Sequence, residues 1–149
     1  MPVKQITPPQ VNSLLDAQER TVYLDVRSID EFDRGHVPGA LNIPLLHLAP
    51  GTRQMVPNAD FLPVVEAVLA KDARVICGCA AGGRSSQAAQ ILLQAGYTDV
   101  QNMEGGFSGA RDPMGHLIAK GWTDHELPVS NDSNDSTSYE ALARRRARR

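Results

Sequence analysis

The sequence is poor in cysteine: only Cys77 and Cys79 occur among its 149 residues. Two cysteines cannot supply the disulfide framework of a small secreted scaffold. No CxxC pair and no Cys/His cluster with zinc-ligand spacing is present, and the four histidines are scattered. We therefore expect a chain that uses neither a metal ion nor another cofactor.

Long apolar runs are missing as well. No segment approaches the roughly 18 apolar residues that a transmembrane helix needs. The first ten residues, MPVKQITPPQ, contain no apolar core of a signal peptide. We therefore expect no membrane partner and a cytoplasmic protein, where a reactive thiol would suit the reducing conditions.

An excess of positive charge, which is typical of nucleic-acid-binding domains, is also absent. The chain has 15 Lys and Arg against 17 Asp and Glu, a formal net charge of -2. Five of the arginines fall in residues 130–149, which begin with SNDSNDSTS and end with RRRARR. We expect no nucleic-acid partner, one domain over residues 1–129, and a disordered polar, then Arg-rich, tail over residues 130–149.

What the sequence does have is the composition of an ordinary globular domain, with 42% hydrophobic and 21% charged residues. A chain of this length buries roughly 70% of the surface that its unfolded form exposes. Compact apolar runs predict short strands over residues 3–7, 21–26, 41–43, 74–77 and 99–103. Helical patterns separate them, which indicates an α/β fold with a parallel sheet covered on both faces.

Local signals mark where the helices begin. Thr7 precedes two prolines and can cap a first helix, and Ser28 with Glu31 forms the pattern of a capping box. Asn58 can cap a third helix that extends to about residue 71. After a fourth helix near residues 85–95, we expect a final helical region that extends to about residue 120.

The segment RVICGCAAGGRSS, residues 74–86, joins a predicted strand to a predicted helix through small residues. Sites in open parallel sheets form beyond the carboxyl ends of the strands, where this loop must lie. Because the loop has little side-chain bulk, its main chain can curl and direct N–H groups inward. Cys79 beside these groups and a helix N-terminus is expected to be largely thiolate, a nucleophile without a histidine partner.

Three motifs, in the same order, resemble the rhodanese (sulfurtransferase) family. They are LDVRSIDEFDRGHVPGALNIP at residues 24–44, CAAGGRS at residues 79–85 and EGGFSGA at residues 104–110. The match extends over about residues 3–128, and the loop is similar to that of single-domain thiosulfate sulfurtransferases. The resemblance implies an α/β fold with a rhodanese-like five-stranded parallel sheet flanked by helices on both faces.

The resemblance also implies an enzyme with a two-step reaction. Cys79 takes a sulfane sulfur from thiosulfate or a similar small donor, becomes a persulfide, and passes the sulfur to cyanide or a thiol acceptor, including a protein thiol. The N–H groups of the loop would stabilise the thiolate and then the terminal sulfur. The loop residues predicted to bind the sulfur are Ala80, Ala81, Gly82, Gly83, Arg84 and Ser85.

Charged residues in these motifs are expected to support the loop. Arg84 either attracts the anionic donor or braces the loop by pairing with an acidic neighbour such as Glu31 or Asp25. Asp25 is expected to hold the loop's shape, and Arg27 and Glu31 to form a structural pair. Arg53, in the longest irregular stretch, is a candidate substrate contact.

Cys77 precedes the predicted nucleophile by two residues. One hypothesis is a resolving thiol, and the other is a small buried strand residue. A disulfide between the two cysteines is disfavoured, because strand residues two apart lie near the upper limit of disulfide Cα separation, about 7 Å. We expect the buried strand residue, and we expect structural roles for His36 and Trp122.

Two other functions stay open at this point. A rhodanese-fold phosphatase or arsenate reductase uses a Cys-x5-Arg loop, whereas only four residues separate Cys79 from Arg84 here. The tighter ring suits a single sulfur atom. A partner-binding persulfide carrier would keep the cysteine, and the uncharged loop favours such a carrier because Ala and Gly do not hold an anion.

Overall fold

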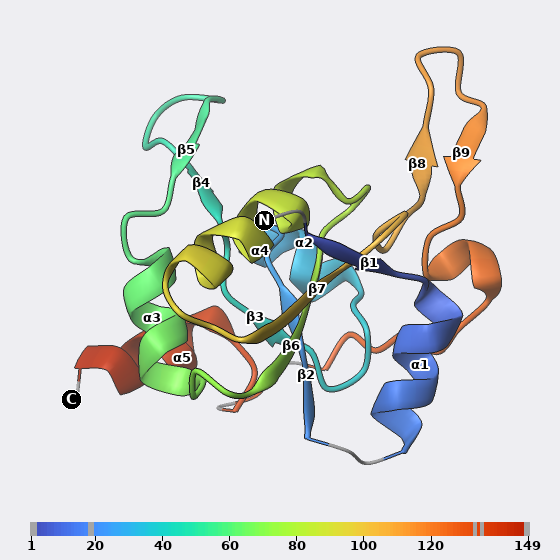
Figure 1. The fold of residues 1–149 in the computed structure, drawn as a ribbon. Helices are drawn as coiled ribbons and strands as arrows, with labels where there is room; N and C mark the ends of the chain where they lie inside the picture. The colour runs from blue at the N-terminus through green and yellow to red at the C-terminus, as the bar shows by residue number, and fades with distance from the viewer. Residues whose placement is uncertain (1–2, 18–19, 133, 135, 148–149) are drawn as a thin grey trace.

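In chain order, a helix lies between each strand of the parallel sheet and the next, as Figure 1 shows. The computed structural model describes residues 3–17, 20–132, 134 and 136–147. In order, the elements are β1 (Lys4–Ile6), α1 (Pro8–Asp16), β2 (Thr21–Asp25), α2 (Ile29–Arg34), β3 (Leu41–Asn42), β4 (Leu46–Leu48), β5 (Met55–Pro57), α3 (Phe61–Val68), β6 (Arg74–Gly78), α4 (Gly83–Gln94), β7 (Asp99–Met103), β8 (Ala110–Arg111), β9 (Leu117–Ala119), the 3-10 helix η1 (Thr123–His125) and α5 (Tyr139–Ala147).

Five strands form one parallel sheet in the order β1-β7-β6-β2-β3, with β6 at its centre. Because side chains alternate along a strand, the two faces carry different apolar residues. Leu24, Val75 and Cys77 pack with α3, α4 and α5, whereas Tyr23 and Ile76 pack with α1 and α2. The predicted α/β fold, a five-stranded parallel sheet flanked by helices on both faces, is confirmed.

The first two helices begin at the predicted caps. The side chains of Thr7 and Ser28 each accept the main-chain N–H three residues further on, and the side chain of that residue bonds back to the cap. The third helix is shorter than expected. Asn58 caps a turn that precedes α3, since its side-chain oxygen accepts the N–H of Asp60.

Two antiparallel hairpins, β4–β5 and β8–β9, form separate two-stranded sheets outside the parallel sheet. The final helical region expected near residue 120 is wrong, because the β8–β9 hairpin occupies it. The side chain of Asp112 accepts the N–H groups of Met114 and His116 and so closes the hairpin turn. The hairpins follow the carboxyl ends of β3 and β7, and Figure 1 shows both projecting on the side where α4 begins.

The C-terminal segment differs most from the sequence-based expectation. The prediction of a disordered tail over residues 130–149 is wrong for α5. This helix packs against α3, and its Leu142 is completely buried. Arg146 also pairs with Asp60 at 2.9 Å. The apolar stripe of α5 consists of Tyr139, Leu142 and Ala143, too short to stand out beside five arginines. The domain boundary at residue 129 stays a prediction.

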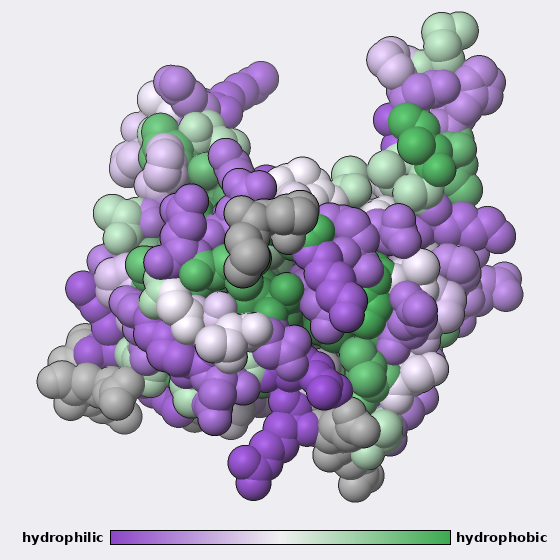
Figure 2. All heavy atoms as spheres, in the orientation of Figure 1, coloured by the Kyte–Doolittle hydropathy of each residue, from purple (hydrophilic) through white to green (hydrophobic). Residues whose placement is uncertain are grey.

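Most of the face seen in Figure 2 is polar; apolar side chains lie along the two hairpins and also near the middle and right of this face. The exposed large apolar residues of the hairpins are Leu48 and Met55 on β4–β5, and Met114, Leu117 and Ile118 on β8–β9. In the described ranges, no helix combines the length and the apolar content that a bilayer crossing requires.

Candidate active site

Cys79 lies at the carboxyl end of the central strand. β6 ends at Gly78, and α4 begins at Gly83. Between them, Gly82 has a φ of +113°, a left-handed conformation that a residue with a Cβ adopts only under strain. The predicted order of strand, small-residue loop and helix is confirmed.

Two groups converge on the sulfur of Cys79. The N–H of Gly82 donates to Sγ at 3.0 Å, and the hydroxyl oxygen of Ser85 lies 3.3 Å from Sγ. Cys79 is only 2% exposed, so both contacts lie in a nearly dry site at the N-terminal end of α4. In the described part of the chain, Gly82 supplies the main-chain N–H bonded to Sγ; the other donors expected from residues 80–85 stay a prediction.

A chain of polar side chains continues from Ser85 across the sheet. Ser85 is fully buried and also contacts the side-chain oxygen of Asn102 on β7. The amide of Asn102, which is 3% exposed, donates to the side-chain oxygen of Gln5 on β1 at 2.8 Å. The sulfur is thereby connected to the exposed edge strand of the sheet.

The turn after β7 holds the loop from its other side. The N–H of Phe107 donates to the carbonyl of Cys79 at 2.7 Å, and that of Ser108 to the carbonyl of Ala80 at 2.8 Å. Gly106 has a φ of +62°, and a Cβ there would lie 2.6 Å from both carbonyl oxygens. Glycine is therefore required for this close approach.

Arg84 braces the loop against α2. Its two terminal nitrogens bind the two oxygens of Glu31 at 2.8 and 3.0 Å. The Arg84 hydrogen bonds are the main reason why the pKa of Glu31 falls from 4.5 to about 2. Glu31 also accepts the hydroxyl of Ser28, which joins the cap of α2 to the first turn of α4. Of the two roles left open for Arg84, this geometry supports the brace.

A second ion pair is buried at the end of β2. Arg27 binds Asp25 at 2.7 Å, with side chains only 5% and 3% exposed. The guanidinium also donates to the carbonyl of Gly35 and lies 4.5 Å from the ring centre of Phe107. The predicted Arg27–Glu31 pair is wrong, because Arg27 turns back to Asp25 at the end of β2, while Glu31 binds Arg84 of α4.

Cys77 lies inside the sheet and has no exposed surface. Burial, followed by the nearby Cys79, raises the pKa of its thiol to about 12. Between the two cysteines, Gly78 is required because the hydroxyl of Tyr23 occupies the space that a Cβ would take. The expectation of a buried strand residue is confirmed.

His36 and Trp122 are buried and bonded to the main chain, as expected of structural residues. Nδ1 of His36 lies 2.7 Å from the carbonyl of Phe32, and the indole N–H of Trp122 donates to the carbonyl of Pro128 at 2.6 Å. Among the described residues, no three His, Cys, Asp or Glu side chains come together as a metal ion would require.

Arg53 is exposed in the turn of the β4–β5 hairpin. Within the described ranges, no hydrogen bond or ion pair joins it to the Cys79 loop, and its role as a substrate contact stays a prediction. A cleft of about 450 Å³ separates this hairpin from α2 and reaches Arg84. The cleft is lined by Ser28, Ile29, Asp30, Glu31, Leu46, His47, Leu48, Met55 and Arg84.

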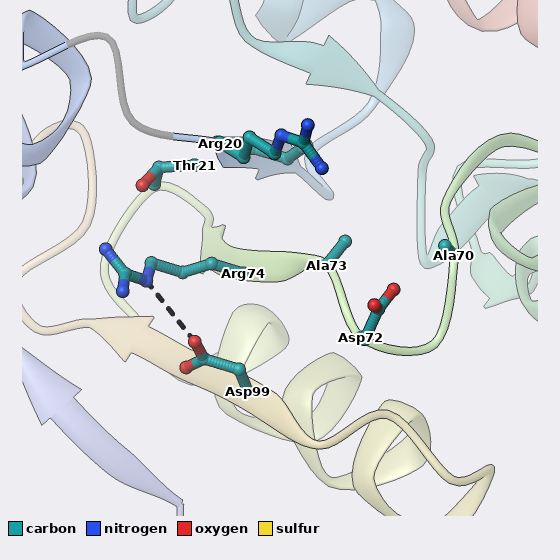
Figure 3. A pocket seen from close by; sticks show the side chains of 8 residues that line it. Arg20, Thr21, Ala70, Asp72, Ala73, Arg74 and Asp99 are labelled. Atoms are coloured by element: carbon teal, nitrogen blue, oxygen red, sulfur yellow. Dashed lines mark hydrogen bonds and ion pairs between the residues drawn. The ribbon is translucent and has the colours of Figure 1, made fainter.

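A hollow of similar size, about 460 Å³, lies at the opposite end of the sheet (Figure 3). Arg20, Thr21, Arg74 and Asp99 from the starts of β2, β6 and β7 line it, and Arg74 pairs with Asp99 at 3.3 Å. Because sites in parallel sheets form at the carboxyl ends, this hollow is not the counterpart of the Cys79 loop.

The geometry of strand, loop and closing turn agrees with a known family. Residues 7–112 match the family described as the Rhodanese-like domain. This chain belongs to the rhodanese family. The resemblance carried by the three sequence motifs is thereby confirmed.

Several relatives of this rhodanese are named sulfurtransferases. Thiosulfate sulfurtransferase 18 of Arabidopsis thaliana is 34% identical over 131 residues, which cover 87% of this chain and 85% of the relative. The human Thiosulfate:glutathione sulfurtransferase is 38% identical over 100 residues, 66% of this chain and 85% of the relative. Protein HIGH ARSENIC CONTENT 1, mitochondrial, of Arabidopsis thaliana is 49% identical over 86 residues, but the matched segment is only 50% of that protein.

Solved structures share the rhodanese fold. Rv0390 from M. tuberculosis aligns with a TM-score of 0.65 at 27% identity, over 89% of this chain and 100% of that chain. The Alr3790 protein from Anabaena aligns with a TM-score of 0.64 over 96% of this chain and 90% of that chain, at 20% identity. At that identity, the second likeness shows the fold alone.

Three residues at the loop of this rhodanese are missed by the sequence analysis: Asn102, Gly106 and Phe107. The last two belong to the EGGFSGA motif of the family resemblance, but the contact of this motif with Cys79 arises only when β6 and β7 pair. The sequence does contain a signal that could have identified Asn102. A polar side chain in a buried strand needs a partner, and Asn102 stands in such a strand.

Proposed function

We propose that this rhodanese moves the outer sulfur of thiosulfate, or of a similar donor, to cyanide or a thiol through a persulfide on Cys79. The main support is the pair of polar groups, the N–H of Gly82 and the hydroxyl of Ser85, within 3.3 Å of Sγ. In a dry site, one well-placed donor contributes about 3 kcal/mol to the stabilisation of developing negative charge.

Each step exchanges one sulfur–sulfur bond for another bond. The thiolate of Cys79 attacks the outer sulfur of thiosulfate, and the electron pair of the broken S–S bond leaves with sulfite. The persulfide then carries a negative terminal sulfur beside the start of α4, where the helix dipole favours an anion. Cyanide or an acceptor thiolate attacks that sulfur, and the departing electron pair restores the Cys79 thiolate.

The test is the intact mass of the chain after incubation with thiosulfate and removal of small molecules. We expect the wild type and Cys77→Ser to gain the mass of one sulfur atom, and Cys79→Ser to gain none. Adding cyanide should remove the extra mass and release thiocyanate. An unchanged mass in the wild type would contradict the proposal.

An arsenate or phosphate reaction is the second candidate, because the relative named HIGH ARSENIC CONTENT 1 is 49% identical to the matched segment. The brace argues against it: both terminal nitrogens of Arg84 are bonded to Glu31 and do not point at an oxyanion beside Cys79. We expect negligible arsenate reduction and aryl phosphate hydrolysis, alongside sulfur transfer. Robust turnover of either compound without sulfur loading would reverse this ranking.

The acceptor can be a thiol on another protein, in which case the chain is a persulfide carrier. Ile29, Leu48 and Met55 expose apolar surface in the cleft that adjoins Arg84. A cysteine peptide flanked by leucines should therefore accept sulfur several-fold faster than one flanked by glycines. Leu48→Ser should reduce this preference without changing sulfur loading, and Val129→Ser, an exposed apolar residue outside the cleft, should leave the preference intact.

The cytoplasmic location stays a prediction from the sequence. The names of two Arabidopsis relatives include the words chloroplastic and mitochondrial, so related proteins occupy more than one compartment. Cell fractionation with an antibody against the chain would test the location directly.

A further inference from the structure

The hydroxyl group of Ser85 has one hydrogen but faces three acceptors. Its oxygen lies 3.3 Å from Sγ of Cys79, 3.2 Å from the carbonyl of Gly82 and 2.5 Å from Oδ1 of Asn102. One hydrogen serves one of these contacts well. Which acceptor receives it decides whether Ser85 offers Cys79 a proton or a lone pair.

The far end of the polar chain settles the direction. Nε2 of Gln5 points to the carbonyl of Val3, so Oε1 of Gln5 is the atom that faces Asn102 and accepts its amide. A reversed Asn102 would set its oxygen against the oxygen of Gln5. Only the orientation with Nδ2 toward Gln5 and Oδ1 toward Ser85 gives every contact one donor and one acceptor. Oδ1 then has no hydrogen to offer, and it receives that of Ser85.

We propose that Asn102 is a positioning residue that, by accepting the Ser85 hydrogen, sets the balance between thiol and thiolate at Cys79. While Ser85 donates its hydrogen to Asn102, it presents a lone pair to Sγ, which can accept an S–H from Cys79 when the thiol carries its proton. When Cys79 loses its proton to a base in solution, the hydroxyl must rotate to Sγ, which leaves Oδ1 without a donor. Because Asn102 is 3% exposed, water cannot replace the hydrogen bond that Oδ1 loses. The cost of this lost bond opposes ionisation of Cys79.

The other groups that act on the sulfur come from different elements and leave this balance untouched. The charge of Cys79 is one of the causes that raise the pKa values of Arg84 on α4, Tyr23 on β2 and Cys77 on β6, so these groups face the sulfur. Asp25 on β2 acts on Arg84. None of their hydrogen bonds passes through Asn102, so its replacement isolates the effect of the Ser85 hydrogen.

The inference rests on Cys79 as the nucleophile of the proposed function, but its test needs no sulfur donor. The rate of iodoacetamide labelling at Cys79 is measured against pH, with the site identified by peptide mass. Asn102→Leu should free the Ser85 hydrogen for Sγ. At pH values below the midpoint of the labelling profile, the labelling rate should rise about five-fold, the effect of one ordinary hydrogen bond. In a Ser85→Ala background, Asn102→Leu should have no such effect. An equal change in both backgrounds, or no change, would overturn the proposal.

Gln5 provides a second test that does not disturb the core, because its side chain is exposed. Gln5→Leu removes the acceptor that orients Asn102, whose amide can then turn toward Ser85. Labelling should rise, although less than in Asn102→Leu. Gln5→Glu keeps an acceptor in place and should not raise it. Equal increases in the two Gln5 variants would refute the role proposed for Asn102. If these variants behave as expected but thiosulfate adds no sulfur to Cys79, only the proposed function is refuted.

Discussion

Cys77 and Cys79 lie two residues apart, and neither side chain is more than 2% exposed, yet their surroundings differ in kind. Cys77 belongs to the central strand, whose main-chain groups are used by the ladders to β2 and β7. Cys79 follows the strand, where the turn at Gly82 frees an N–H that points at the sulfur. The chain therefore surrounds one thiol with apolar groups and offers the other hydrogen bonds.

This difference teaches that burial alone does not make a cysteine inert. A buried thiolate is disfavoured when nothing replaces the water that it loses, as at Cys77, where burial is the main cause of a pKa near 12. At Cys79, the N–H of Gly82 is fixed where water would otherwise donate a hydrogen bond. The two thiols are about equally buried. The structural thiol lies within β6, whereas the proposed nucleophile lies just after the strand ends, where a main-chain N–H can reach its sulfur.

The sharpest contrast is expected in alkylation of the folded chain. At pH 8, a thiol with a pKa of about 12 is ionised to roughly one part in ten thousand, and Cys77 is also closed to reagent. Iodoacetamide should label Cys79 at least about a thousand-fold faster, as measured by peptide mass against time. The two rates should converge in denaturant. Comparable labelling in the folded chain would break the comparison.

The next effect concerns the turn that holds the loop. Gly106→Ala sets a Cβ 2.6 Å from the carbonyl oxygens of Cys79 and Ala80. We expect sulfur transfer to fall about a hundred-fold, because displacement of the loop by about 1 Å has effects of that size. Gly115→Ala is the matched control, since Gly115 also has a positive φ but has nothing within 4 Å of a Cβ. Equal activity in the two variants would show that the clamp is dispensable.

These two regions also differ in how far the sequence predicts them. The strand, the loop and the capping boxes depend on neighbours within a few residues, and the structure agrees with their prediction. Ion-pair partners depend on where side chains of different elements point. Arg84 pairs with Glu31, one of the two partners that the sequence suggested for it, whereas Arg27 pairs with Asp25 rather than with the expected Glu31.

The same limit applies to packing against distant elements. α5 is stabilised by burial of Leu142 against α3, a contact between segments about 80 residues apart that no local pattern shows. Asn102 meets Ser85 only because β7 lies beside β6. The candidate nucleophile is thus visible in the sequence, whereas the groups that hold and tune it are visible in the fold.

Replacing the structural thiol by a hydroxyl should lower stability and spare activity. In Cys77→Ser, a hydroxyl is buried in an apolar cluster, and we expect a cost of about 1–3 kcal/mol in the free energy of unfolding. Urea unfolding measures the loss, and sulfur transfer should stay within about two-fold of wild type. Cys77→Ala, which buries no polar group, is the control. A large loss of activity in Cys77→Ala at full stability would give Cys77 a chemical role.

The smallest effect is expected at the ion pair between Arg84 and Glu31, which braces the loop against α2. The folded pKa of Glu31 is about 2, below its usual 4.5. Its carboxylate therefore stabilises the fold above about pH 4.5, and this contribution fades as pH falls toward 2.

Glu31→Gln removes the charge of this brace while keeping its shape. Because the pair is partly exposed, with side chains 25% and 29% accessible, we expect a loss of about 1 kcal/mol at pH 7 in urea unfolding. The difference from wild type should shrink between about pH 4.5 and pH 2. Asp30→Asn, one residue earlier on the exposed side of α2, should show no such trend. A Glu31→Gln deficit that is constant with pH would mean that Arg84 braces the loop by packing rather than by charge.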